Sequence, residues 1–193
     1  MNRTDTDEDA AAVIAATRAW LERAVIGLDL CPFAGAVHLG NRIRWCVSAA
    51  RTPEALLDDL ARELLALQNA DPQDCETTLL IHPRVLGDFP DFNDFLDAAD
   101  GALEELGLEG EIQVASFHPQ YRFAGTGPDE IGNFTNRSPY PTLHLLREAS
   151  IERALAACSD TDAIYEKNIR TLRGLGIDGW RRLWLDEPPS STD

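Results

Sequence analysis

Apolar residues recur along this chain with two different periods, which predict helices and strands in alternation. Spacings of three and four residues are typical of a helix with one buried face, whereas short β-branched and apolar runs are typical of buried strands. The pattern predicts strands at 43–48, 77–81 and 112–117. It predicts helices at about 7–28, from 53, from 91, at about 141–157 and at 160–173.

Strands that alternate with helices of this length are typical of βαβ units, whose strands run parallel. We therefore expect an α/β fold with a small, mainly parallel sheet flanked by helices and a helical C-terminal third. The chain has 193 residues and no internal repeat or low-complexity linker, so we expect a single domain over 1–193. Residues 1–7 and 187–193 are expected to be mobile tails.

The charge of the chain narrows the expected partners. Because the formal net charge is -16, most of the surface would repel a nucleic-acid backbone, so no nucleic-acid partner is expected. The acidic opening MNRTDTDEDA lacks the apolar core of a signal peptide. No apolar run approaches the roughly 20 residues that cross a bilayer. These features predict a cytoplasmic protein with no membrane partner.

The spacing of the cysteines also favours a cytoplasmic protein. Cys31, Cys46, Cys75 and Cys158 show no CxxC spacing, which disfavours a zinc ribbon and predicts reduced thiols. Cys31, in LCPFAG, is a candidate nucleophile because it lies near a histidine and a helix end. A helix C-terminus raises the pKa of a thiol, however, so burial is the favoured interpretation.

Two predicted strands end in the same dipeptide, His82-Pro83 and His118-Pro119. Ligands of open α/β sheets bind beyond the carboxyl ends of the strands, so a parallel sheet would place both histidines at that edge. The alternative is that each histidine caps its strand and bonds a loop carbonyl. This alternative is favoured for His82, whereas the two interpretations are evenly matched for His118.

The segment that follows, residues 118–140, has neither helical nor strand periodicity. Loops longer than about 12–15 residues are uncommon in compact domains unless they are functional or disordered. We expect this one to be ordered by apolar anchors, which are Tyr121, Phe123, Ile131, Phe134 and Tyr140. Many of its polar side chains would then satisfy the backbone of the loop itself.

The same region carries candidate ligands for an anion. From 112 to 150 Arg122, Arg137 and Arg147 balance three acids, so this region is neutral within a strongly acidic chain. The planar guanidinium group matches phosphate or carboxylate in two-point contacts. The candidate substrate-binding residues are Arg137, Arg147, Asn133, Asn136 and Ser138. The alternative is that these arginines pair with nearby acids and hold the loop.

A candidate metal site depends on the helix predicted at 141–157. His144 and Glu148 would share one face of that helix, and such a pair can bind one divalent metal ion, with His118 or Asp129 completing the set. His118, His144 and Glu148 are also the candidate catalytic residues, because imidazole suits acid–base chemistry near neutrality. The spacing is unspecific, and no HExxH, glycine-rich phosphate loop or GxSxG occurs in the chain.

Four longer phrases indicate a family. They are VIGLDLCPFA (25–34), ETTLLIHP (76–83), QVASFHPQYRFAG (113–125) and NRSPYPTLHLLREASI (136–151). The chain resembles the bacterial domain-of-unknown-function family fourteen-fifteen over about 20–180. This resemblance implies a bacterial cytoplasmic protein and supplies no activity.

Two functional hypotheses follow. The first is an enzyme that acts on a small anionic substrate, through metal-assisted hydrolysis with His118, His144 and Glu148 at its centre. The second is a non-catalytic module that uses the surface of 118–148 to bind a ligand or a protein partner. They differ in whether the polar side chains converge on an open pocket.

Overall fold

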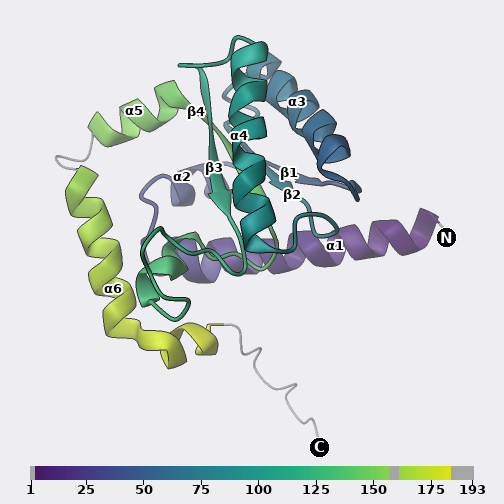
Figure 1. Cartoon of the computed structure of the whole chain (residues 1–193). Coiled ribbons are helices and arrows are strands. Elements are labelled where there is room, and N and C mark those ends of the chain that lie inside the picture. Colours follow the sequence, from purple (N-terminus) through teal and green to yellow (C-terminus); the bar gives the residue numbers. More distant parts are fainter. Residues whose placement is uncertain (1–2, 157–160, 184–193) are drawn as a thin grey trace, which may run out of the picture.

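A four-stranded sheet in the order β1-β2-β4-β3 forms the centre of the computed structural model, which describes residues 3–156 and 161–183 (Figure 1). The strands are β1 (Ile43–Val47), β2 (Thr77–Ile81), β3 (Ile112–Phe117) and β4 (Thr142–Arg147). β1 and β2 are parallel, whereas β4 is antiparallel to both β2 and β3. The α/β class is confirmed, and the expectation of a mainly parallel sheet is wrong.

The prediction of a helix at 141–157 is wrong for the first half of that range. Residues 142–147 form β4, and helix α5 (Glu148–Ala156) begins only afterwards. β4 lies between β2 and β3, where Leu143 pairs with Leu80 and Leu145 pairs with Val114. Leu143 and Leu145 are fully buried. The pairing with two strands therefore overrides the helix preference of a leucine-rich segment.

The remaining helices surround the sheet. They are α1 (Arg3–Trp20), the π-helical turn η1 (Leu21–Ile26), α2 (Ala34–Leu39), α3 (Pro53–Asn69), α4 (Phe89–Glu105), the 3-10 turn η2 (Ile131–Asn136) and α6 (Thr161–Arg182). α3 begins where the sequence predicts, because Thr52 Oγ1 accepts a hydrogen bond from the Ala55 N–H and Pro53 fits the first turn. None of the helices in this described part of the chain is long and apolar enough to span a membrane.

The ends of the chain differ from the expected boundaries. The first helix begins at Arg3, within the expected tail 1–7, and the last helix continues beyond Gly174. It kinks at Gly176, whose φ of 67° lies in the left-handed region that favours glycine. The expected tail 187–193 lies outside the described residues.

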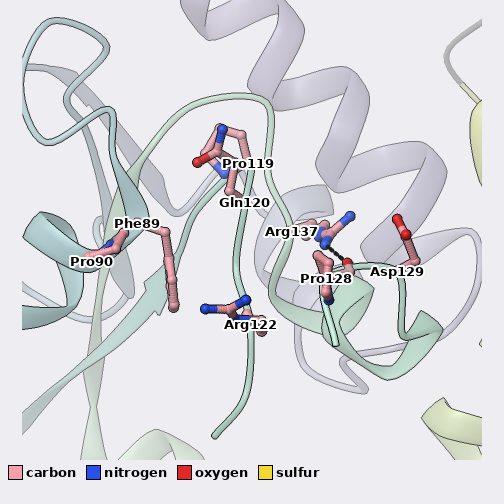
Figure 2. Close-up of a pocket in the computed structure, with 8 residues that line it drawn as sticks. All are labelled: Phe89, Pro90, Pro119, Gln120, Arg122, Pro128, Asp129 and Arg137. Carbon is pink, nitrogen blue, oxygen red and sulfur yellow. Dashed lines mark hydrogen bonds between the residues drawn. The ribbon is translucent and has the colours of Figure 1, made fainter. Parts of the chain in front are cut away.

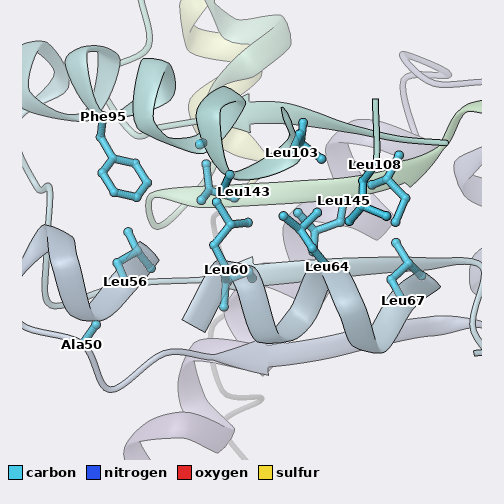
Figure 3. Packing of buried hydrophobic residues seen from close by; sticks show 14 of the residues in the cluster. Ala50, Leu56, Leu60, Leu64, Leu67, Phe95, Leu103, Leu108, Leu143 and Leu145 are labelled. Carbon is cyan, nitrogen blue, oxygen red and sulfur yellow. The ribbon is translucent and has the colours of Figure 1, made fainter. Parts of the chain in front are cut away.

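The sheet separates two apolar layers. α3 and α4 cover one face, where their side chains pack against Leu80, Leu143 and Leu145 (Figure 3). Four leucines of α3 are fully buried there: Leu56, Leu60, Leu64 and Leu67. The burial of each such side chain contributes about 1.5–3 kcal/mol. On the other face α1 and η1 pack with η2 and α6 around Trp20, Phe134 and Trp180.

Candidate functional site

The two His-Pro dipeptides lie at the same edge of the sheet. β2 and β3 are both antiparallel to β4, so they run in one direction and end at one edge. The backbone N–H of His82 donates to Pro141 O at 3.0 Å, and that of His118 donates to Asn136 O at 3.1 Å. The expectation of a shared edge therefore holds, although the sheet is mixed.

The side chain of His82 is fully buried. Nδ1 lies 3.1 Å from Val85 O, and since a carbonyl can only accept, Nδ1 carries the proton. Nε2 has no hydrogen-bond partner among the described residues, and the ring stacks on Phe92 at 5.6 Å. Burial lowers the pKa of His82 to about 4, so the ring is neutral at pH 7.

Both ring nitrogens of His118 are engaged. The Gln120 N–H donates to Nδ1 at 3.0 Å, so Nε2 carries the proton and donates to Leu86 O at 3.2 Å. The side chain is buried, and burial lowers the pKa of His118 from its ordinary value. The alternative in which this histidine bonds a loop carbonyl is the one that its geometry fits.

Together the two histidines hold the loop between β2 and α4. His82 bonds the carbonyl of Val85 and His118 bonds that of Leu86. Leu86 has a φ of 55°, in the left-handed region that is unfavourable for a leucine. These bonds fix the direction in which the chain enters α4 and so position Phe89, the first residue of that helix.

Asn133 organises the long loop. Its side chain is fully buried, and Oδ1 accepts from the Phe123 N–H at 3.0 Å and from Thr126 Oγ1 at 2.8 Å. Its Nδ2 donates to Gly127 O at 2.8 Å. Three bonds to residues 6 to 10 positions away close the loop on itself. Asn133 therefore supports the loop from inside.

Asn136 and Ser138, also predicted to bind substrate, bond the backbone instead. Asn136 Nδ2 donates to Ser116 O at 3.1 Å, which ties the end of the loop to β3. Ser138 Oγ donates to Tyr140 O at 2.6 Å. The expectation that many polar side chains satisfy the loop itself agrees with these contacts.

His144 lies on β4 rather than on a helix. Thr77 Oγ1 donates its only proton to Leu145 O at 2.5 Å, so it accepts from His144 Nε2–H at 2.8 Å. Burial lowers the pKa of His144 to about 4. The helical face that would have joined His144 to Glu148 does not exist, because the helix begins at Glu148 itself.

Arg147 supports the end of α3. Its Nη2 donates to Leu67 O at 2.6 Å, to Ala70 O at 2.7 Å and to Cys75 O at 3.3 Å. Two of these carbonyls belong to the last turn of α3 and its C-cap, where few backbone donors follow, although Leu67 O also accepts from the Ala70 N–H at 3.2 Å. Arg147 thus adds donors at this end of α3, and it does not line the pocket near residues 118–140, although it was predicted to bind the substrate.

The sheet keeps His118 and His144 apart. The ring of His118 lies 5.1 Å from Phe92 of α4, on one face. The ring of His144 lies 6.1 Å from Phe117, which contacts Trp20 of α1 on the other face. The two imidazoles therefore face opposite layers.

Glu148 is separated from His118 along the direction of the strands. It follows Arg147, which pairs with Ile112 at one end of β3, whereas His118 follows Phe117 at the other end. Five strand steps of about 3.3 Å separate these ends by roughly 17 Å. No three His, Cys, Asp or Glu side chains in the described ranges lie close enough to hold a metal ion. The predicted set His118, His144, Glu148 and Asp129 is not assembled.

Cys31 is unsuited to act as a nucleophile. Burial raises the pKa of its thiol, which reduces the thiolate fraction at neutral pH. Cys31, Cys46 and Cys75 are free thiols, as the sequence predicts. Cys158 lies outside the described residues.

A pocket does open beside the loop (Figure 2). Its volume is about 370 Å³. It is lined by Phe89, Pro90, Pro119, Gln120, Arg122, Pro128, Asp129 and Arg137. It lies next to the turn that His118 supports, since Pro119 and Gln120 belong to that turn.

Two arginines give this pocket its chemistry. Arg137 is held in place, because it donates to Tyr121 O at 3.4 Å and Pro128 O at 2.5 Å and its guanidinium lies 4.0 Å from the centre of the Phe134 ring. Arg122 differs, since its guanidinium has no hydrogen-bond or ion-pair partner within the residues described. In the view of Figure 2 it is directed toward Phe89.

Sequence reasoning identified only part of this pocket. Arg137 was predicted to bind the substrate and Asp129 only to complete a metal site, whereas Phe89, Pro90 and Gln120 were missed. Arg122 appeared only in the charge balance of its region. Its place directly after Tyr121, an expected apolar anchor of the loop, is the sequence signal that could have selected it.

A second pocket, of about 530 Å³, lies between η2 and α6. Its charged residues are Glu130, Glu166, Arg170 and Arg173, so two acids balance two arginines. Arg170 also pairs with Glu166 at 3.3 Å. This pocket is therefore less suited to an anion than the first.

Comparison with known proteins gives one match. No curated protein and no solved structure matches this chain. The sequence model of a family described as "Protein of unknown function (DUF1415)" matches residues 12–182. Since that match spans most of the chain, and agrees with the resemblance carried by the four phrases, the protein belongs to the DUF1415 family.

Proposed function

We propose that the protein binds a small molecule bearing a phosphate or carboxylate group in the pocket between Phe89 and Arg137. The observation that carries the proposal is Arg122, an exposed guanidinium that points into this pocket without a partner among the described residues. A guanidinium offers paired donors that match the oxygens of either anion.

The local charge supports an anion as the ligand. Arg122 and Arg137 contribute +2 and Asp129 contributes −1, so the ionisable side chains lining the pocket sum to +1. The whole chain has a formal net charge of -16. A positive pocket on an acidic surface attracts a small anion locally, while the rest of the surface repels extended polyanions.

The geometry favours recognition over metal-assisted hydrolysis. The three residues expected to perform catalysis, His118, His144 and Glu148, lie on different faces and at different ends of the sheet. His118 is nearest the pocket, but both its nitrogens are bound to backbone groups. The proposal keeps the cytoplasmic location expected from the sequence, and the free thiols of the described cysteines support it.

Calorimetric titration of Arg122→Gln tests this proposal. Compounds from a panel of phosphate monoesters and carboxylates that raise the melting temperature of the wild-type protein would be titrated into both proteins. We expect Arg122→Gln to weaken binding about tenfold to a hundredfold, because hydrogen bonds to charged groups contribute about 1.5–3 kcal/mol. The fold should be unaffected, since no described contact is lost.

Arg51→Gln is the matched control. Arg51 is also exposed and without a partner in the described part of the chain, so the change in charge is the same. It follows β1, at the opposite side of the sheet from β3. Equal weakening by both substitutions would mean that only the overall charge matters, and the proposed site would be rejected.

A further inference from the structure

The pocket is much larger than a phosphate or carboxylate group alone. Its volume of about 370 Å³ equals that of about twelve water molecules at the roughly 30 Å³ each takes in the liquid. Volumes of this size are typical of sites for organic ligands, which fill them with an apolar body. We infer, on the basis of the proposed function, that the ligand is an aromatic phosphate or carboxylate whose ring packs against Phe89.

Four apolar residues line the pocket. They are Phe89 and three prolines, Pro90, Pro119 and Pro128. The planar ring of phenylalanine and the rigid ring of proline can pack against an aromatic ring with little loss of their own conformational freedom. The apolar residues come from both the start of α4 and the long loop, so the wall exists only in the folded protein.

The ring of Phe89 is held in place by aromatic neighbours. Its ring makes an edge contact with Tyr121 at 5.2 Å and lies 5.5 Å from the ring of His118. It also lies 6.4 Å from Phe92, yet the residue remains partly exposed. The Phe89 ring is therefore held by three aromatic neighbours while part of the residue remains accessible to a ligand.

The anion-binding group lies beside this wall. Arg122 follows Tyr121, the residue that braces Phe89, so the guanidinium and the ring are positioned by adjacent residues. Figure 2 shows the guanidinium of Arg122 directed toward Phe89. A ligand in which the anionic group is joined directly to a ring would contact both. Asp129 and Gln120 could also accept hydrogen bonds from amino or hydroxyl groups on the ring.

Matched pairs of ligands test this inference. Methyl phosphate and phenyl phosphate carry the same monoester group, as acetate and benzoate carry the same carboxylate. We expect phenyl phosphate or benzoate to bind about tenfold more tightly than its methyl counterpart. Phe89→Leu, which keeps apolar volume but removes the flat ring, should abolish this difference. Tyr165→Leu, at the second pocket, should preserve it.

The outcomes separate this inference from the proposed function. Equal binding of the matched ligands, abolished by Arg122→Gln, would reject the aromatic ligand and retain the anion site. Absence of binding by both phosphates and both carboxylates would reject the proposed function and this inference with it. A preference for the ring that survives Phe89→Leu, or that Tyr165→Leu removes, would also overturn the inference.

Photochemical labelling keeps the test valid if Phe89→Leu does not fold. Wild-type protein would be labelled with azidophenyl phosphate and digested with trypsin. Label confined to the tryptic peptides 85–122 and 123–137, and suppressed by excess phenyl phosphate, is the expected result. Label that is found mainly in other peptides would overturn the inference.

Discussion

The backbone N–H of Gln120 donates a hydrogen bond to Nδ1 of His118, and this bond joins a buried histidine to the wall of the pocket. The opposite nitrogen of the same ring binds Leu86 O, three residues before Phe89. One imidazole therefore holds both the loop segment and the helix start that line the pocket. His118 positions the site without being placed to react in it.

Replacing His118 should affect stability and ligand binding together. His118→Ala leaves the Gln120 N–H and the Leu86 carbonyl without partners and creates a cavity, so we expect a loss of about 2–4 kcal/mol in the free energy of unfolding. Each kcal/mol lowers the melting temperature by roughly 2–4 °C for a chain of this size. Urea denaturation measures the loss, and a change below about 0.5 kcal/mol would contradict this role.

Stability should depend on pH through His82, which is buried, and His144, which is partly buried. Burial lowers the pKa of His82 and of His144 to about 4, below the ordinary 6.5 of the unfolded chain. Below pH 6.5 the unfolded state therefore binds more protons, so stability is complete above about pH 6.5 and falls as the pH decreases toward 4. The slope should approach about 1.4 kcal/mol per pH unit for each histidine.

Measurements between pH 7 and pH 5 isolate this effect, because most carboxylates titrate below that range. Urea denaturation of wild type and His144→Gln gives the free energy of unfolding at each pH. The variant should show a smaller slope, since one of the two imidazoles with a lowered pKa is missing. Identical slopes for the two proteins would rule out a contribution from His144.

His144 also tests the metal hypothesis directly. Its bond to Thr77 Oγ1 indicates a structural role, so His144→Ala should cost about 1–3 kcal/mol by leaving the buried hydroxyl without a donor. The melting temperature of the wild-type protein should not change with a chelator. If a chelator destabilised the wild-type protein but not the variant, that result would support the metal site that the geometry disfavours.

Arg147 should contribute to stability and not to binding. Arg147→Met keeps an unbranched apolar side chain but removes the donors to the Leu67 and Ala70 carbonyls at the end of α3. We expect a loss of about 1.5–3 kcal/mol in the free energy of unfolding. Ligand affinity should stay within twofold of wild type, and Arg153→Met, on the exposed surface of α5, is the control. A tenfold loss of ligand affinity in Arg147→Met would instead show that Arg147 takes part in binding.

The long loop should be ordered by Asn133. Asn133→Ala removes three hydrogen bonds and leaves the Phe123 N–H without its partner, so the loop should open more often. Trypsin should then cleave after Arg122 and Arg137 faster than in wild type, which mass spectrometry of the fragments would detect. Rapid cleavage at these sites in the folded wild-type protein would contradict an ordered loop.

The local pattern of the sequence determined the positions of two strands. Strands 77–81 and 112–117 occur at the predicted positions, because short runs of β-branched and apolar residues that end at a His-Pro dipeptide favour extended structure. The same reasoning placed His82 and His118 beyond the ends of those strands. Their common direction then brings them to one edge, whether the sheet is parallel or mixed.

Tertiary structure alone decided the identity of residues 142–147 and the composition of the site. A leucine-rich segment satisfies a helix or a central strand equally well, and the free place between β2 and β3 selected the strand. Because residues 142–147 form a strand, His144 lies on the opposite face of the sheet from His118 and Arg147 lies at the end of α3. Whether an arginine is bound or available depends on neighbours distant in sequence, so only the folded chain distinguishes Arg122 from Arg147.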